Sequence, residues 1–362
     1  MRFCFLLLIV VSCGGVAPRP EDIAAREPVP AVSIAAQQDG AVLADQAWQH
    51  GRAGDWAEAR QVAETALALD PRSARAHAVL GRCLMEEAAA QQPPELADWR
   101  RAEGELRLAA RLAPDDVEIA ILLGEFLQAD GHLAAATEVL ASALDREPDH
   151  VGCLAAAARL HFELAEERAA LPLLRRLRQL RPDDRESLLR LAHCELALAR
   201  TERRLPGGGP NAVAGLERAA AAFSAYRRAV PEDAAGWVGE GFARLTLWRE
   251  AGADPSAADL AEVEALFEGA SDRWSSSPEP EFNLGVVREL RNDAPGARDA
   301  YGRALERDPE HLPALLNLAA SLADAGRETE AEDFARRALA LSPSDSEAGQ
   351  LRAFLASRAA GQ

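Results

Sequence analysis

The chain has 362 residues and a formal net charge of −18, with 58 acidic against 40 basic residues. A surface this acidic repels other polyanions, which argues against nucleic acid and anionic lipid as binding partners. Every basic residue is an arginine and alanine is abundant, a bias that we attribute to genomic base composition rather than to function.

The N-terminus, MRFCFLLLIVVSC, places one arginine before an apolar run that is too short to span a bilayer. Cys13 closes this run after small residues, which resembles the lipobox of bacterial lipoproteins, whose cysteine is acylated and becomes residue one after cleavage. The resemblance implies a signal peptide over residues 1–12 and a lipid on Cys13. Because Gly14 rather than aspartate follows, it also implies an outer-membrane lipoprotein of the bacterial cell envelope that faces the periplasm. A plain signal peptide cleaved near Ala17 is the alternative.

Residues 13–39 are rich in Pro and Ala and show no helical periodicity. They are expected to form a flexible tether whose root-mean-square length is roughly 30 Å. Such a tether would hold the rest of the chain near a membrane, with the lipid anchor as its only membrane contact.

Between residues 40 and 345 the chain matches itself at a period of 34 residues. Prolines show this period most clearly, in two runs of 34-residue steps: Pro114, Pro148 and Pro182, then Pro309 and Pro343. Proline cannot continue the helix that it follows and suits the joint before the next one. The spacing therefore predicts helical units joined at prolines. An ordinary alanine-rich helical bundle, the alternative, does not account for the period.

Small side chains recur at fixed positions of each unit. The eighth position holds Ala47, Gly81, Gly124, Ala158, Ala192, Gly241, Gly285 and Ala319. A position on the second helix holds Ala59, Ala102, Ala136, Ala170, Ala222, Val263, Ala297 and Ala331. The position seven residues later holds Ala66, Ala109, Ala143, Leu177, Ala229, Ala270, Ala304 and Ala338. Small residues let two helices approach closely, so each unit is predicted to be a packed helix pair.

Self-similarity at this period, with small residues and a proline at fixed positions, resembles the tetratricopeptide repeat (TPR) family. The resemblance implies an all-α fold, a right-handed α-solenoid of about eight helix–turn–helix repeats. The repeats are expected to start near residues 40, 74, 117, 151, 185, 234, 278 and 312.

Residues 346–362 are expected to form a capping helix and a tail, because Leu351, Phe354 and Leu355 follow an i, i+3, i+4 pattern that would cover the last repeat. Repeats two, five and six are longer than 34 residues. Their extra residues fall at the turn within the repeat and are expected to form longer helices or loops. The largest insertion, in repeat five, is centred on Pro206 to Pro210.

No catalytic, dinucleotide-binding or calcium-binding motif occurs in the sequence. His150 with Cys153, and His193 with Cys194, offer only two ligands each, so no metal site and no cofactor are predicted. The cysteines outside the N-terminal segment, Cys83, Cys153 and Cys194, are expected to be small buried thiols rather than a disulfide framework.

The inner surface of such a solenoid, lined by the first helices, is where the family's ligand peptides lie. The residues assigned to this groove are Trp48, Arg75, Arg82, Glu118, Glu125, Arg159, Phe162, His193, Phe242 and Phe282. They do not match the Lys/Asn carboxylate clamp of chaperone-binding members. Three of them, Phe162, Phe242 and Phe282, are expected to be exposed aromatics, which tend to mark binding surfaces. The same residues could also be merely solvated.

The sequence therefore predicts a membrane-anchored protein–protein interaction scaffold, not an enzyme, that binds a peptide or helix in its groove during bacterial envelope assembly or secretion. The expected partner is a protein or peptide, with no nucleic acid and no small-molecule substrate. A soluble, self-associating structural protein of the periplasm is one alternative, and a repeat-supported enzyme is another.

Overall fold

The computed structural model describes residues 34–91, 96–205, 207–341 and 344–359; within these ranges it contains 17 helices and no strand. The helices are α1 (Ile34–Ala53), α2 (Trp56–Leu69), α3 (Ala74–Ala90), α4 (Leu96–Leu112), α5 (Val117–Ala129), α6 (Leu133–Arg146), α7 (Val151–Glu163), α8 (Glu167–Leu180), α9 (Arg185–Arg203), α10 (Gly209–Ala229), α11 (Ala234–Ala251), α12 (Ala257–Arg273), α13 (Glu279–Leu290), α14 (Ala294–Arg307), α15 (Leu312–Asp324), α16 (Glu328–Ala340) and α17 (Asp345–Ala359).

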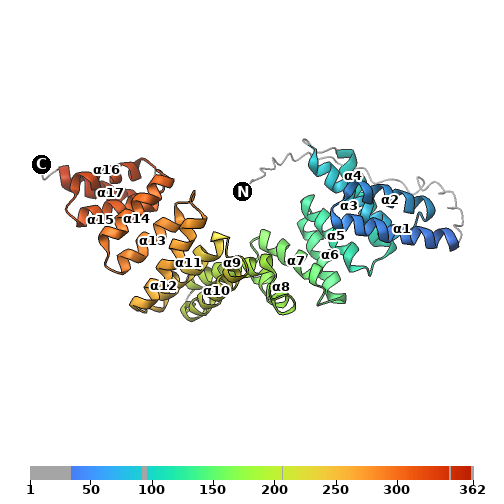
Figure 1. Cartoon of the computed structure of the whole chain (residues 1–362), viewed down its shortest axis with the longest axis horizontal. Coiled ribbons are helices and arrows are strands. Elements are labelled where there is room, and N and C mark those ends of the chain that lie inside the picture. Colours follow the sequence, from blue (N-terminus) through green and yellow to red (C-terminus); the bar gives the residue numbers. More distant parts are fainter. Residues whose placement is uncertain (1–33, 92–95, 206, 342–343, 360–362) are drawn as a thin grey trace.

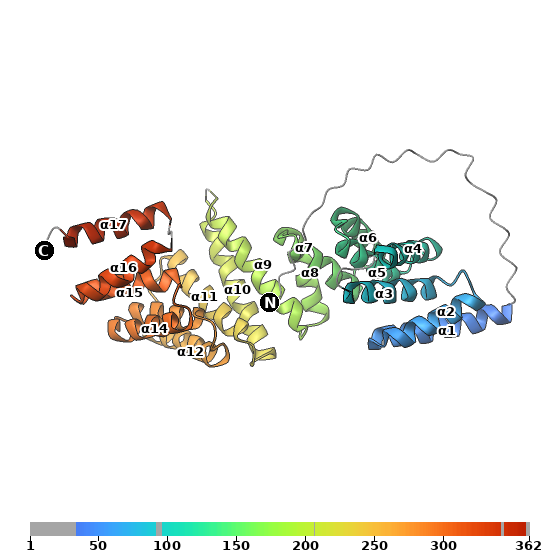
Figure 2. The ribbon, with the colours of Figure 1, turned by 90° about the horizontal axis from the view of Figure 1, so that it is seen from above.

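Consecutive helices form antiparallel pairs, with the odd-numbered helix first in each repeat and the even-numbered helix second. Each pair packs mainly against the pairs before and after it, so the pairs stack in chain order along the longest axis (Figure 1). Figure 2 shows the same order from above, with α1 and α17 at opposite ends. This arrangement confirms the expected all-α solenoid of helix–turn–helix repeats.

The helix α17 closes the last repeat as expected. Leu351 is buried and Leu355 packs beside it on the core of the final two repeats, whereas the side chain of Phe354 lies outside the described part of the structure. None of the helices that the structure describes combines the length and the hydropathy that crossing a membrane requires. The N-terminal segment that carries Cys13 lies outside the described residues.

The first repeat begins earlier than residue 40, because α1 starts at Ile34. Gly40 lies inside this helix and is buried, and a Cβ on it would lie 3.1 Å from the Cβ of Asp70. Its lack of a side chain therefore serves the packing of α1 against the end of α2 and does not mark a helix boundary. The turn between the two helices falls at Gly54, whose φ of +83° favours glycine.

The eighth-position residues allow the two helices of a repeat to touch. All eight are buried, and the glycines among them have no room for a side chain. A Cβ would lie 2.7 Å from Leu106 on Gly81 and 2.4 Å from the ring of Tyr301 on Gly285. The small residues found in phase in the sequence are thus the contact points of the helix pairs, as predicted.

The predicted packing register was wrong in one helix, α10. In the other second helices the buried positions follow a 0, +4, +7 pattern, as at Ala102, Leu106 and Ala109. In α10 this pattern falls on Ala219, Phe223 and Tyr226, three residues before the predicted slots, and the predicted Ala229 is only half-buried. A shift of three residues keeps nearly the same face of a helix toward the core. Because residues 219–222 are all alanine, the sequence offers a small residue in either register and does not reveal the shift.

The insertions of repeats five and six appear largely as additional helical turns. The first helices of three repeats of standard length, α5, α7 and α15, have 13 residues each. By contrast, α9 has 19 residues and α11 has 18. In repeat two, α3 is also extended, to 17 residues, while residues 92–95 lie outside the described ranges.

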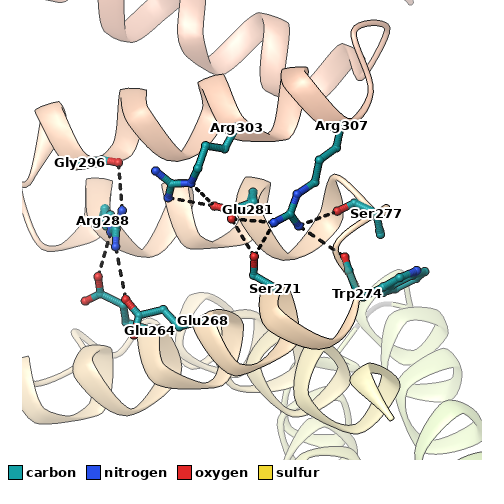
Figure 3. Close-up of polar contacts among 10 residues, drawn as sticks. All are labelled: Glu264, Glu268, Ser271, Trp274, Ser277, Glu281, Arg288, Gly296, Arg303 and Arg307. Atoms are coloured by element: carbon teal, nitrogen blue, oxygen red, sulfur yellow. Dashed lines mark hydrogen bonds and ion pairs between the residues drawn. The ribbon is translucent and has the colours of Figure 1, made fainter. Parts of the chain in front are cut away.

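Buried glutamates on three first helices each bind two arginines. Glu195 binds Arg175 and Arg218, Glu240 binds Arg227 and Arg244, and Glu281 binds Arg303 and Arg307. Figure 3 shows Glu281 between its two arginines of α14, with the Ser271 hydroxyl of α12 donating to the same carboxylate at 2.7 Å. The Glu281 carboxylate therefore joins α12, α13 and α14, and so ties one repeat to the next.

Candidate functional site

The N-terminal repeats enclose a pocket of about 500 Å³. Side chains of α1, α3 and α5 line it, together with Trp56 at the start of α2, the first residues of α7, and Arg181, which follows α8. Three of the predicted groove residues, Trp48, Arg82 and Glu118, share this pocket although they come from three different repeats. The solenoid thus brings together residues that the sequence assigned to one groove without showing that they share a pocket.

Two tryptophans of this pocket are covered by arginines. The guanidinium carbon of Arg75 lies 5.3 Å from the centroid of the Trp48 ring, and that of Arg82 lies 5.7 Å from the Trp56 ring. Asp45 holds Arg75 through an ion pair of 2.5 Å. Cation–π contacts of this kind hold an arginine in place without neutralising it. The pocket therefore combines apolar rings with Arg82, which is held at a fixed position and paired with acidic side chains, and Arg75 lies beside it.

Glu125 links the first helices of three successive repeats. Arg82 of α3 contacts one carboxylate oxygen at 2.5 Å, and Arg159 of α7 contacts the other at 2.6 Å. Arg82 also pairs with Glu86, one turn along its own helix, at 2.8 Å. Because these charges satisfy one another, Glu125 and its two arginines hold α3, α5 and α7 together beside the pocket.

Glu118 and His150 form the polar end of the pocket. The Nδ1 atom of His150 accepts a hydrogen bond from the backbone N–H of Cys153, which caps the start of α7. The proton of the neutral ring is therefore on Nε2, which faces the Glu118 carboxylate at 3.5 Å. The carboxylate keeps further acceptor positions for the N–H groups of a bound chain.

The remaining predicted groove residues lie outside this pocket. Phe162 and His193 approach each other, with ring centroids 6.4 Å apart, and Arg190 lies over the Phe162 ring at 5.9 Å. The His193 ring also meets the edge of the buried Phe223 ring at 5.2 Å. These rings extend the core between α7, α9 and α10, so they do not form one site with Trp48.

The expectation that three phenylalanines are exposed was wrong. Phe162, Phe242 and Phe282 are all half-buried. Phe282, for example, packs against the rings of Tyr301 and His311 at 5.8 and 5.2 Å. The second helix of its own repeat and the joint to the next repeat thus cover Phe282, contacts that helical periodicity alone does not reveal.

Several pocket residues were missed in the sequence. Trp56 is the first residue of α2, and Arg181 and His150 lie at joints between helices, so none occupies the first-helix position used to find groove residues. Leu122 is one turn from Glu118 and was overlooked because it resembles an ordinary core residue. The one signal in the sequence was the pair of tryptophans, Trp48 and Trp56, on either side of the turn at Gly54.

The three cysteines that the structure describes lie in the core. Cys83, Cys153 and Cys194 are buried free thiols, as expected. Burial raises the pKa of the first two to about 11 and that of Cys194 to about 12, so little reactive thiolate forms at neutral pH. Within the described residues, no group of three or more His, Cys, Asp or Glu side chains is placed to hold a metal ion.

A protein-family model described as tetratricopeptide repeat matches residues 44–91 and 282–346. No curated protein matches the chain. Among solved structures, the human IFIT1 dimer with m7Gppp-AAAA is 18% identical, with a TM-score of 0.43, over 84% of this chain and 72% of that one.

Two further solved structures are described as TPR proteins. YrrB, "a TPR protein with an unusual peptide-binding site", is 14% identical with a TM-score of 0.46, over 58% of this chain and 95% of that chain. TTC0263, a thermophilic TPR protein of Thermus thermophilus, is 22% identical with a TM-score of 0.37, over 57% of this chain and 100% of that chain.

Proposed function

We propose that this chain, a tetratricopeptide-repeat protein, is a scaffold that binds a peptide or helix of a protein partner against its first helices. The observation that carries the proposal is the pocket shared by Trp48, Trp56, Arg82 and Glu118. Its volume of about 500 Å³ suits one large apolar side chain with its neighbouring backbone.

The chemistry of this pocket specifies its ligand in outline. The tryptophan rings, with Val79 and Leu122, offer apolar surface for an anchor side chain. Glu118 can accept N–H groups of the ligand backbone, and Arg52 and Arg181 at the margin can bind carbonyl or carboxylate oxygens. The expected ligand is therefore a peptide with an aromatic or large aliphatic anchor.

Replacing Trp48 by alanine is expected to weaken peptide binding by about tenfold or more, because aromatic anchors at the centre of an interface typically contribute at least about 2 kcal/mol. The ligand would first be selected from a phage-displayed random peptide library on the full chain. Affinities of the synthetic peptide for the wild type and the variant are then compared by fluorescence anisotropy. Trp274→Ala is the matched control, since Trp274 is exposed and lies outside the pocket.

Three outcomes would count against this site. Peptides selected on the wild type could bind the Trp48→Ala variant equally well, or the library could yield no binder at all. A selected ligand whose binding depends on Trp274 but not on Trp48 would move the site to another part of the solenoid.

We also propose that Cys13 anchors the chain as a lipoprotein of the bacterial envelope, where it would serve envelope assembly or secretion. The support is the sequence alone, with a thiol placed where a short apolar run ends. Labelling in bacterial cells with an alkyne fatty acid is expected to mark the wild type and the Cys4→Ala control. The label should disappear in Cys13→Ala, and its persistence there would exclude this anchor.

A further inference from the structure

A second pocket, of about 500 Å³, lies between α9, α10 and α11. Phe242 and Leu216 form its apolar surface, and four arginines line it: Arg200, Arg203, Arg204 and Arg249. In a chain of net charge −18, four arginines around one pocket are a local reversal of charge. The proposed peptide pocket shares none of these residues.

The additional helical turns of repeats five and six build this pocket. A first helix of 13 residues, as in α5 and α7, would end α9 at residue 197 and α11 at residue 246. All four arginines lie beyond those points. The insertions, which the sequence left without a role, therefore supply the charged side chains, whereas the standard repeat supplies Phe242.

Most of the positive charge in this pocket is not neutralised. Glu250 is the one acidic residue of its lining, and it pairs with Arg203 at 2.9 Å and with Arg249 at 3.4 Å. Arg200 and Arg204 form no ion pair within the described ranges. The Arg200 guanidinium lies 4.9 Å from the Phe242 ring centroid, which holds it in place while its N–H groups stay available.

Glu250 also shows an unfilled acceptor. Its Oε1 atom is shielded from solvent and, within the described part of the chain, accepts no hydrogen bond. The ion pair with Arg249 at 3.4 Å offsets part of the desolvation of this oxygen, and a hydrogen-bond donor would offset more of it. A ligand that carried an N–H group beside its negative charge would satisfy Glu250 and the free arginines together.

We propose that this pocket binds an acidic residue of a peptide, with the carboxylate on Arg200 and Arg204 and a backbone N–H on Glu250. Guanidinium groups form paired hydrogen bonds with carboxylates, which suits this ligand. A nucleic acid carries a phosphate at every nucleotide and no N–H group on its sugar–phosphate backbone, whereas a peptide has a backbone N–H next to each acidic side chain for Glu250, so an acidic peptide is favoured. The proposal extends beyond the Trp48 pocket and stands or falls separately from it.

The test uses the full chain and two fluorescein-labelled peptides, one of alternating leucine and glutamate and one in which glutamine replaces each glutamate. Anisotropy titrations are expected to show the acidic peptide binding at least about tenfold more tightly. The double variant Arg200→Gln/Arg204→Gln should abolish that difference. Trp48→Ala should leave it unchanged, which separates failure of this proposal from failure of the peptide pocket.

A matched control removes the same two charges elsewhere. Arg100 and Arg101 of α4 are exposed and, within the described ranges, form no ion pair, so Arg100→Gln/Arg101→Gln should retain the preference for the acidic peptide. The proposal is overturned if the control loses the preference equally, since the effect would then be long-range charge. Equal binding of the two peptides, or tighter binding of an RNA oligonucleotide or a phosphopeptide at this pocket, would also overturn it.

Discussion

Replacing Glu281 by alanine is expected to destabilise the C-terminal repeats by about 3–5 kcal/mol, the usual cost of breaking a buried ion pair by removing one partner. Glu281 is 4% exposed, and its carboxylate accepts hydrogen bonds from Arg303 at 2.9 Å and Arg307 at 3.0 Å (Figure 3). Its loss leaves two arginines and the hydroxyl of Ser271 without their common acceptor.

The expected loss should be local, because each repeat of a solenoid contacts only its neighbours. Hydrogen exchange measured by mass spectrometry should therefore show lost protection in α13 and α14, with little change in α1 to α6. Glu186→Ala is the control, since Glu186 pairs with Arg190 at 2.6 Å but is 68% exposed. Surface pairs contribute about 0–1 kcal/mol. Equal effects of the two substitutions would show that the buried network does not hold the repeats together.

Replacing Gly285 by alanine is expected to destabilise the protein by about 1–3 kcal/mol, the range for overpacking a core. The new Cβ would lie 2.4 Å from Cε1 of Tyr301, whose side chain is fully buried and has no space to retreat. The same change at Gly302 should have the opposite sign. A Cβ there meets nothing within 4 Å, and alanine is favoured over glycine inside a helix by about 0.5–1 kcal/mol. Urea denaturation followed by circular dichroism measures both.

A compensating substitution tests the cause of this effect. Repeat four has an alanine, Ala158, at the eighth position, where repeat seven has Gly285. Its second helix has Leu174 at the position that Tyr301 occupies in repeat seven. In a Tyr301→Leu background, Gly285→Ala is therefore expected to cost less than it does alone. Equal costs in the two backgrounds would mean that contact with the Tyr301 ring is not the source of the strain.

The repeat architecture could be predicted because its constraints are local and periodic. A proline such as Pro148 ends one helix and begins the joint to the next, and a glycine such as Gly124 lets two helices touch. Each requirement recurs at 34-residue spacing, so many weak signals add in phase. The register predicted for α10 was wrong because there the repeated signal is ambiguous. Its run of alanines at 219–222 fits the core pattern at two positions three residues apart, and only the packing of Phe223 and Tyr226 decides between them.

The sequence by itself thus determined the helices, their pairing and their stacking, since these follow from helix propensity, small residues and proline joints. Only the tertiary structure decided which side chains meet across repeats. Arg82 contacts Glu125, which is 43 residues away in the sequence. The arginines of α9 and α11 meet around Phe242 because these two helices are longer than the first helices of the standard repeats. The physical reason is that such contacts depend on the rotation between successive helix pairs. That rotation is set by the summed packing of whole interfaces, and no single residue pattern records it.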